Sequence, residues 1–377
     1  MRILKLCYEY PPIGGGGGQV AAALSQELVK LGHQVDLVTM SFDGLPSFEQ
    51  DQGVNIYRVP AVRLKKSICH PPEMATYLVS ALPILLWMVR HNHYDINHTH
   101  FIFPDAILSS ILKKTTNLPY IITAHGSDVP GYNPNRFKLL HRILEPIWRQ
   151  VVRDAKGIVS PSQNLAHLIT KKAPDVAITL IPNGIHSRSK EITAIDDPHI
   201  LVVSRMFERK GIQYFFASLE GTRHPFQVDI VGDGPYLPTL KTQAMNLNTN
   251  ARITFHGWLD HNSAKLQELM EKASIFILPS ETENFPVVLL EAMAAGLAII
   301  TTQGTGCEEV VGNAALLVKP RDPAAILEAL MTLIDRPELR LELSQAASQR
   351  VETEFKWQVI ARRYIDLYQQ AIINDHR

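Results

Sequence analysis

Two carboxylates at a fixed spacing are the first residues of this chain that could do chemistry. Glu283 lies in a short polar segment, and Glu291 follows it after seven intervening residues, inside an otherwise apolar stretch. Burying a carboxylate is costly unless its oxygens accept hydrogen bonds, and the hydroxyl groups of a sugar are suitable donors. A solvated Glu291 on an outer helix face is the plainer alternative. The apolar residues on both sides of Glu291 favour a carboxylate that contacts a ligand.

Two cations form a second candidate group. Arg205 follows the expected strand Ile200–Ser204, and Lys210 stands with Gly211 before an expected helix, Ile212–Leu219. Arg and Lys are usually solvated on the surface. At a junction between strand and helix they can instead hold an anion such as a phosphate. We therefore expect an anion site at this junction.

A histidine and a run of glycines complete the set of candidates. His125 follows the expected strand Tyr120–Thr123, which distinguishes it from an ordinary structural histidine. The glycines, Gly14–Gly18, separate the expected strand Ile3–Cys7 from a helix expected over Gln19–Leu31. Such a turn allows a phosphate to approach the helix N-terminus closely. A flexible loop is an equal alternative, and a dinucleotide site is a weaker one because G-x-G-x-x-G is not matched cleanly.

The elements that must position these residues alternate between strand and helix. Around Glu283, an apolar strand, Ile275–Leu278, precedes a helix, Val287–Ala295, and Gly296 lies where a helix C-terminus favours glycine. A second strand, Leu297–Thr301, completes a βαβ unit. In parallel sheets built from such units, ligands bind at the carboxyl ends of the strands. The candidate residues are expected at such strand ends, in an α/β fold.

Composition limits the classes of function. The chain has 377 residues, of which 46% are hydrophobic and 20% charged, enough for two soluble domains. A formal net charge of zero gives no reason to expect nucleic acid as a partner. Three cysteines far apart in the sequence disfavour a disulfide framework or zinc site and suit a reducing cytoplasm. Residues 2–8 resemble a strand rather than a signal peptide.

One apolar segment raises the question of membrane contact. The run Met74–Val89 is shorter than the roughly 20 residues of a bilayer span and is interrupted by Pro83. A packed helix is therefore the expected structure. Peripheral membrane contact through Arg63–Val89, which Lys65 and Lys66 would assist, is the alternative.

These motifs, taken together, resemble those of a known family. Glu283, seven residues, Glu291 and then Ala-Met-Ala-Ala-Gly are similar to the signature of the retaining GT-B glycosyltransferases of family 4. The block from His125 to Asp128 resembles the family's His-Gly-x-Asp segment. The sequence Ser-Arg-Met-Phe-Glu-Arg-Lys-Gly, which contains Arg205 and Lys210, resembles the segment that holds the donor diphosphate.

The resemblance implies a fold class and a domain organisation. The fold would be α/β of the GT-B type, with two Rossmann-like, doubly wound domains facing a central cleft. The expected parts are an acceptor-side domain at 1–185, a linker at 186–198, a nucleotide-sugar domain at 199–356, and a helix at 357–377 that returns to the first domain.

It also implies a role for each candidate. His125 would support the donor sugar, and Glu283 would orient the hydroxyls of that sugar. Arg205 and Lys210 would hold the diphosphate, and Glu291 would accept hydrogen bonds from the ribose. Further donor contacts would come from the turn at Gly15 and Gly16 and from the backbone at Val287 and Val288.

The expected reaction is transfer of a hexose from a nucleotide-diphosphate sugar to a hydroxyl of a glycan, lipid-linked or small-molecule acceptor, with retention (EC 2.4). The chain contains no Asp-x-Asp, so we expect no metal, and no cofactor beyond the donor substrate. The expected setting is cell-envelope or polysaccharide biosynthesis, in the cytoplasm or at the inner face of the membrane. No nucleic-acid partner is expected.

One departure from the family pattern leaves the donor sugar open. Many relatives have Glu-Gly-Phe-Gly where this chain has Glu283-Asn284-Phe285-Pro286, and Pro286 has no N–H to donate. Two other functions remain as alternatives. One is a sugar-nucleotide epimerase or hydrolase of the same fold, and the other is a sugar-nucleotide-binding protein without catalysis.

Overall fold

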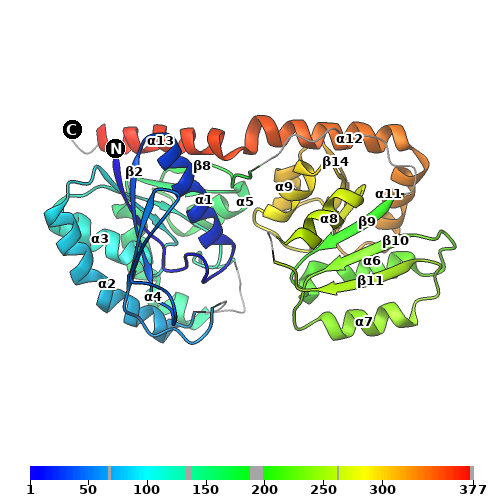
Figure 1. Cartoon of the computed structure of the whole chain (residues 1–377), viewed down its shortest axis with the longest axis horizontal. Helices are drawn as coiled ribbons and strands as arrows, with labels where there is room; N and C mark the ends of the chain where they lie inside the picture. Colours follow the sequence, from blue (N-terminus) through cyan, green and yellow to red (C-terminus); the bar gives the residue numbers. More distant parts are fainter. Residues whose placement is uncertain (67–68, 133–137, 187–197, 261–262, 374–377) are drawn as a thin grey trace. The chain divides into compact units, whose positions relative to one another are not determined.

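The computed structural model describes residues 1–66, 69–132, 138–186, 198–260 and 263–373, with only the backbone described at 138–142 (Figure 1). Contacts divide the chain into two compact units. Unit 1 comprises Met1–Gly184 and Trp357–Arg377, and unit 2 comprises Ile185–Lys356. Unit 1 thus ends one residue before the expected boundary at 185. The expected linker, 186–198, lies almost entirely outside the described residues.

Unit 1 is built on an eight-stranded sheet within the described residues, in the order β3-β4-β2-β1-β5-β6-β7-β8. Of the strands described in this unit, β3 alone runs antiparallel, against β4. The strands are β1 (Arg2–Leu6), β2 (Gln34–Met40), β3 (Phe48–Asp51), β4 (Val54–Val59), β5 (Ile96–His100), β6 (Tyr120–Thr123), β7 (Gly157–Ser160) and β8 (Ile178–Leu180). The described helices are α1 (Gly16–Lys30), α2 (Pro71–His91), α3 (Asp105–Thr116), α4 (Lys138–Asp154), α5 (Gln163–Lys172) and α13 (Trp357–Ile373).

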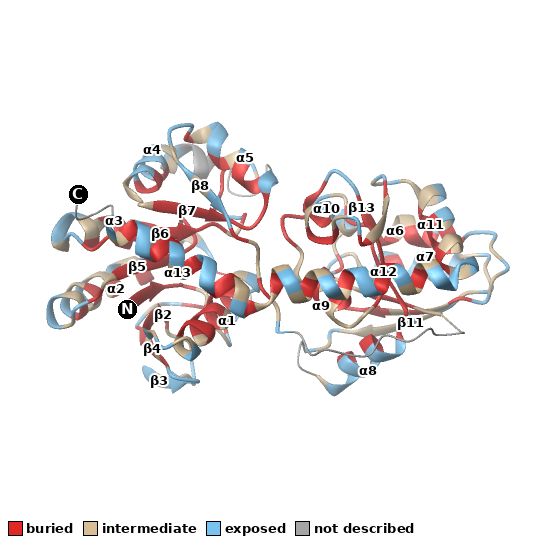
Figure 2. Cartoon of the chain, turned by 90° about the horizontal axis from the view of Figure 1, so that it is seen from above, coloured by how far each residue is buried: buried red, intermediate tan, exposed pale blue. Residues whose placement is uncertain are grey.

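The last helix, α13, belongs to the core of unit 1. Its apolar and aromatic side chains recur at helical spacing and are buried, among them Trp357, Ile360, Tyr364 and Tyr368. They join a cluster that contains Leu24 of α1. Figure 2 shows that the inner strands β5, β6 and β7 are buried, whereas the edge strands β3 and β8 are largely exposed and the helices expose one face. Residues 357–373 are therefore part of the first structural unit.

In the part of unit 2 that the structure describes, six parallel strands form a sheet in the order β11-β10-β9-β12-β13-β14. The strands are β9 (His199–Val203), β10 (Gln227–Val231), β11 (Arg252–Gly257), β12 (Ile275–Leu278), β13 (Ala298–Thr302) and β14 (Ala315–Val318). The helices are α6 (Ile212–Leu219), α7 (Leu237–Asn246), α8 (Ala264–Lys272), α9 (Val287–Ala294), α10 (Gly306–Val311), α11 (Pro323–Asp335) and α12 (Pro337–Arg350). A 3-10 turn, η1 (Glu208–Lys210), precedes α6, and a π-helical turn, η2 (Val351–Phe355), follows α12.

Both sheets have a point at which the strand order reverses. In unit 1, β1 lies between β2 and β5, and in unit 2, β9 lies between β10 and β12. Successive connections leave the sheet in opposite directions at such a point, which opens a crevice at the carboxyl ends of the strands. The glycine turn follows β1, and Arg205 and Lys210 follow β9. The topology of each unit therefore places candidate residues where ligands bind.

The start of α1 differs from the sequence prediction. The helix begins at Gly16 rather than at about Gln19, so Gly16–Gly18 are helical and the flexible-loop alternative is wrong for them. Close packing explains the absence of a side chain at Gly17 and Gly18. A Cβ at Gly18 would lie 2.1 Å from the carbonyl oxygen of Glu9, and one at Gly17 would lie 2.4 Å from Phe101 Cζ.

Helix α2 contains the apolar run Met74–Val89 and extends it at both ends. Its length and composition alone would allow it to cross a membrane, but core helices of soluble proteins share these properties. One face, which includes Tyr77, Ala81 and Leu85, is buried in the core of unit 1. The prediction of a packed helix is consistent with this burial.

Candidate functional site

An ion pair between Lys210 and Glu283 is the centre of the candidate site in unit 2. Lys210 ends η1 after β9, and Glu283 follows β12. Because β9 and β12 are parallel neighbours, their carboxyl ends meet at one edge of the sheet. Lys210 Nζ donates a hydrogen bond to Glu283 Oε1, and the two side chains are 15% and 9% exposed. The sequence predicted a function for each residue but not their contact.

Two hydroxyl groups orient Glu283. Ser280 Oγ donates to Glu283 Oε1 at 2.7 Å, and Thr302 Oγ1 donates to the carbonyl oxygen of Ser280 at 2.6 Å. Oε1 thus receives hydrogen bonds from both Lys210 and Ser280. Within the described part of the chain, Oε2 has no such partner. One carboxylate oxygen is fixed by the protein, and the other remains for a ligand.

Two glycines allow the loops around Glu283 to approach one another. Gly306 donates its backbone N–H to the carbonyl oxygen of Glu283 at 3.1 Å, and a Cβ there would lie 1.6 Å from the Asn284 carbonyl oxygen. Gly211 has a φ of +71°, and a Cβ there would lie 1.9 Å from the carbonyl oxygen of Pro279. The backbone contacts leave little freedom in the position of Glu283.

The remaining candidates of unit 2 lie on the same two connections as Lys210 and Glu283, after β9 and after β12. Arg205 is exposed at the end of β9, with its guanidinium 5.1 Å from the ring centroid of Phe207. Val287 and Val288 begin α9, whose first backbone N–H groups have no partner within the helix. Glu291 is half-buried, which is intermediate between the solvated and the buried carboxylate that the sequence allowed. The positive end of α9 thus follows the Glu283 loop directly.

In unit 1, the glycine turn combines open space with tight packing. Gly14 has a φ of +89°, Gly15 precedes α1, and Gly16 is its first residue. A Cβ at Gly15 or Gly16 would have no protein atom within 4 Å. Gly17 differs, because a Cβ there would meet Phe101 and His125. The geometry therefore leaves room for a ligand at Gly15 and Gly16, the pair that the resemblance indicates.

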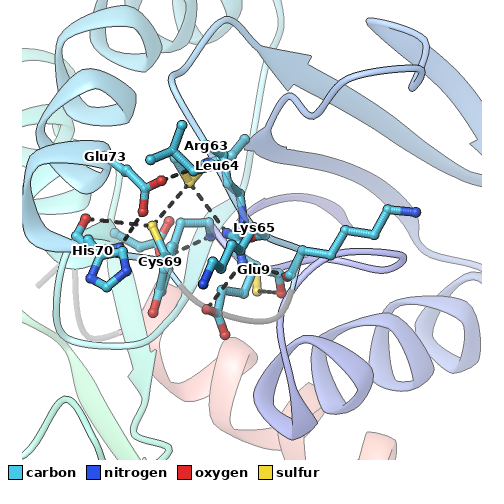
Figure 3. A network of polar contacts seen from close by, with 12 residues as sticks. Glu9, Arg63, Leu64, Lys65, Cys69, His70 and Glu73 are labelled. Atoms are coloured by element: carbon cyan, nitrogen blue, oxygen red, sulfur yellow. Dashed lines mark hydrogen bonds and ion pairs between the residues drawn. The ribbon is translucent and has the colours of Figure 1, made fainter.

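The loop of residues 61–66, between β4 and α2, supports this turn (Figure 3). The Arg63 side chain is fully buried and faces Glu9 at 3.5 Å. Its guanidinium donates to the carbonyl oxygens of Lys65, at 3.1 Å, and Lys66, at 2.9 Å. The Lys66 oxygen also accepts the backbone N–H of Gly14 at 2.7 Å. A buried arginine thus fixes the loop to the start of the glycine turn.

His125 lies beside a second histidine that sequence reasoning did not select. The Nδ1 of His100, at the end of β5, is 3.1 Å from His125 Nε2. Asp128 accepts the backbone N–H groups of His125 and Gly126, which shapes the loop. Burial, with a contribution from the charge of Lys5, lowers the pKa of His125 to about 3. His125 is therefore neutral at physiological pH. A pKa so far below that pH also makes it a weak general base.

Two family descriptions match this chain and together span both units. Residues 14–189 match "Glycosyltransferase Family 4", and residues 186–350 match "Glycosyl transferases group 1". The matched ranges contain the glycine turn, His125, Arg205, Lys210 and Glu283.

Relatives and solved structures resemble the chain along its whole length. It is 27% identical to the N-acetyl-alpha-D-glucosaminyl L-malate synthase of Bacillus anthracis, over 100% of this chain and 98% of that protein. The sucrose-phosphate synthase of Thermosynechococcus elongatus has a similar structure, with a TM-score of 0.81, 22% identity and coverage of 99% of both chains. Anabaena HepE in complex with UDP-glucose has a TM-score of 0.74 and 14% identity, and covers 98% of this chain and 100% of its own.

These matches confirm the predicted family and the predicted α/β fold of the GT-B type. The strand orders of the two sheets agree with that fold. The chain therefore belongs to the group 1 glycosyltransferases, and it is a GT-B enzyme that transfers hexose units.

Proposed function

We propose that this glycosyltransferase transfers a hexose from a nucleotide-diphosphate sugar to an acceptor hydroxyl, with retention of anomeric configuration and without a metal ion. The observation that carries the proposal is the Lys210–Glu283 pair at the strand-order reversal of unit 2, with Arg205 on the same connection. The pair places a cation for a phosphate next to a carboxylate for sugar hydroxyls.

Charge on the leaving group is the main requirement of the reaction. As the bond between the anomeric carbon and the diphosphate breaks, negative charge grows on the diphosphate. Lys210 has three N–H donors, of which one meets Glu283, so others remain for phosphate oxygens. Arg205 and the N-terminus of α9 add positive potential nearby. No step needs a metal, in keeping with the absence of Asp-x-Asp from the sequence.

Glu283 serves as an orienting group in this proposal. Its Oε2 accepts a hydroxyl of the donor sugar, while Oε1 stays with Lys210 and Ser280. The acceptor hydroxyl attacks the anomeric carbon on the face that the diphosphate leaves. Its oxygen forms the new bond, and its proton passes to the departing phosphate oxygen. A neutral His125 supports the donor sugar and takes no proton.

Related proteins support the proposed classes of donor and acceptor. HepE has been solved with UDP-glucose, which supports a UDP-sugar as the first donor to test. The Bacillus anthracis relative is named for transfer to malate, which supports a hydroxyl acceptor. Three cysteines are free and buried in the structure, which suits the proposed location in a reducing cytoplasm.

The first test is ligand-dependent stability. Thermal unfolding is measured with UDP-, GDP- and ADP-sugars, since a ligand at 100 times its Kd adds about 2.7 kcal/mol to the free energy of unfolding. The stabilising donor is then incubated with candidate acceptors, and NMR of the product gives its anomeric configuration. An inverted product would refute retention. Free sugar or an isomer formed without acceptor would indicate a hydrolase or epimerase.

The second test separates Lys210 from its neighbour in η1. Lys210→Ala should lower kcat/KM by roughly 100-fold, because the charge acts most strongly in the transition state. Arg209→Ala is the matched control, since Arg209 is exposed on the same turn, and its kcat/KM should stay within about twofold of wild type. Equal activities of the two variants would contradict the assignment of Lys210.

A further inference from the structure

Three buried polar side chains, Lys5, His98 and His100, lie on one face of the unit 1 sheet, and His100 contacts His125. Lys5 of β1 is in register with His98 of β5, and His100 is two residues further along β5. Alternate residues of a strand point to the same face, so these side chains share a face of the sheet. All three are completely buried. His125 therefore lies beside a buried face of the sheet that carries one lysine and two histidine side chains.

The contact between His100 and His125 fixes one nitrogen of each ring. His100 Nδ1 and His125 Nε2 are 3.1 Å apart, and the rings stack with centroids 5.3 Å apart and an interplanar angle of 18°. Burial and the charge of Lys5 lower the pKa of both imidazoles, so both are neutral at physiological pH. Each neutral ring carries one N–H. One ring must therefore donate and the other accept.

The other nitrogen of His100 decides between the two arrangements. His100 Nε2 is buried and has no hydrogen-bond partner among the described residues. If His125 were the donor, His100 would carry its hydrogen on Nε2, and that buried N–H would lack an acceptor, at a considerable cost. If His100 is the donor, Nε2 holds only a lone pair.

Neighbouring groups hold both rings in place. The two nitrogens of His98 are occupied, Nδ1 by Tyr368 Oη at 2.7 Å and Nε2 by Thr123 Oγ1 at 2.8 Å. The His98 ring lies against His100, with centroids 4.4 Å apart. On the other side, Phe101 packs on His125 with centroids 4.5 Å apart. The rings have little freedom to rotate out of their hydrogen bond.

We propose that His100 is a positioning residue that donates its Nδ1–H to His125 Nε2 and thereby holds His125 in the tautomer with hydrogen on Nδ1. Nδ1 of His125 makes no hydrogen bond with any described residue, and the side chain is half-buried. His125 consequently offers a fixed hydrogen-bond donor to an oxygen of the nucleotide-sugar. The inference rests on the proposed function, in which His125 supports the donor sugar.

The tautomer can be measured without substrate. In protein labelled with ¹⁵N-histidine, long-range ¹⁵N–¹H NMR distinguishes the two neutral tautomers, and the spectrum of His125→Asn identifies the His125 signals. We expect hydrogen on Nδ1 of His125 at neutral pH. His100→Phe should produce a mixture of tautomers. Hydrogen on Nε2 of His125 in the wild-type protein would overturn the proposal.

Kinetics test the consequence for the reaction. His100→Phe should lower kcat/KM about tenfold or more. His100→Asn should recover most of the loss, because the Asn amide nitrogen can take the place of Nδ1–H. His93→Asn is the control, since the His93 side chain is 94% exposed. Equal activities of the Phe and Asn variants at position 100 would show that the donated hydrogen bond has no part in transfer.

The outcomes separate this inference from the function on which it rests. If His125→Asn keeps full activity while the NMR result is as expected, the role of His125 in donor binding fails and its tautomer stands. If His100→Phe does not fold, the wild-type spectrum and the His100→Asn variant decide the question.

Discussion

Two adjacent glycines should respond in opposite directions to the same substitution. Gly16 and Gly17 both lie in the first turn of α1, and neither has a positive φ, so alanine is sterically allowed by the backbone of either. Alanine is favoured over glycine in a helix by up to about 1 kcal/mol. At Gly16 the new Cβ meets no atom within 4 Å. Gly16→Ala should therefore leave the free energy of unfolding unchanged or raise it by up to about 1 kcal/mol.

At Gly17, a steric clash opposes the gain in helix propensity that alanine brings. Its Cβ would lie 2.4 Å from Phe101 Cζ and 3.1 Å from His125 Cγ. Phe101 is 4% exposed and is held edge-on by Tyr8, with ring centroids 5.1 Å apart, so it cannot move freely. Overpacking of this kind costs about 1–3 kcal/mol. Gly17→Ala should therefore be less stable than Gly16→Ala by about that amount.

Calorimetry of the ligand-free variants measures the difference. For a unit of about 200 residues, 1 kcal/mol corresponds to about 2–4 °C in Tm, so the two Tm values should differ by about 2–12 °C. Gly17→Ala should also lower kcat, because Phe101 and His125 must shift. Equal Tm values of the two variants would refute the close packing of Gly17 against Phe101 and would favour the flexible loop instead.

Three further outcomes are expected. Activity should be unchanged in EDTA, and a strict metal requirement would refute the metal-free mechanism. Because the pKa of His125 is lowered to about 3 from an ordinary value of 6.5, the unfolded chain binds a proton between these pH values that the folded chain does not. The free energy of unfolding should fall as pH falls, and denaturant titrations of His125→Asn from pH 5.5 to 4 should give a slope smaller by about 1.4 kcal/mol per pH unit; an unchanged slope would contradict the shifted pKa. Arg63→Met should raise the donor KM by releasing the loop that holds Gly14, whereas Lys65→Met, at an exposed position of the same loop, should not; equal KM values would argue against this support.

Local patterns in the sequence were sufficient for the elements around Glu283. The structure has β12, α9 and β13 within a residue of the expected ranges, and Gly296 has a φ of +75° after the helix. Each of these features depends on residues a few positions apart: apolar runs for buried strands, a proline before the helix, and glycine after it. The sequence therefore predicted the loop that carries Glu283.

Contacts between distant residues were not predictable in the same way. Lys210 and Glu283 are 73 residues apart and meet only because β9 and β12 are neighbours in the sheet. The sequence predicted too late a start for α1, because Gly17 and Gly18 pack against Phe101 and Glu9, which lie outside the helix. His100 carried one usable signal, a polar residue at the end of a buried strand, but its partner lies 25 residues away. Tertiary packing determined each of these features.

The loop of residues 61–66 has a fixed backbone but exposed side chains. Its backbone is fixed by Arg63 and by the carboxylate of Glu73, which accepts the N–H of Leu64 at 2.7 Å, whereas the side chains of Val62 and Leu64 are 56% and 77% exposed. Substitutions at those exposed positions can change the chemistry of this surface without moving the glycine turn. An insertion in the same loop would instead displace the carbonyl group that holds Gly14. The geometry therefore tolerates changes of side chain at Val62 and Leu64, whereas it constrains the length of the loop.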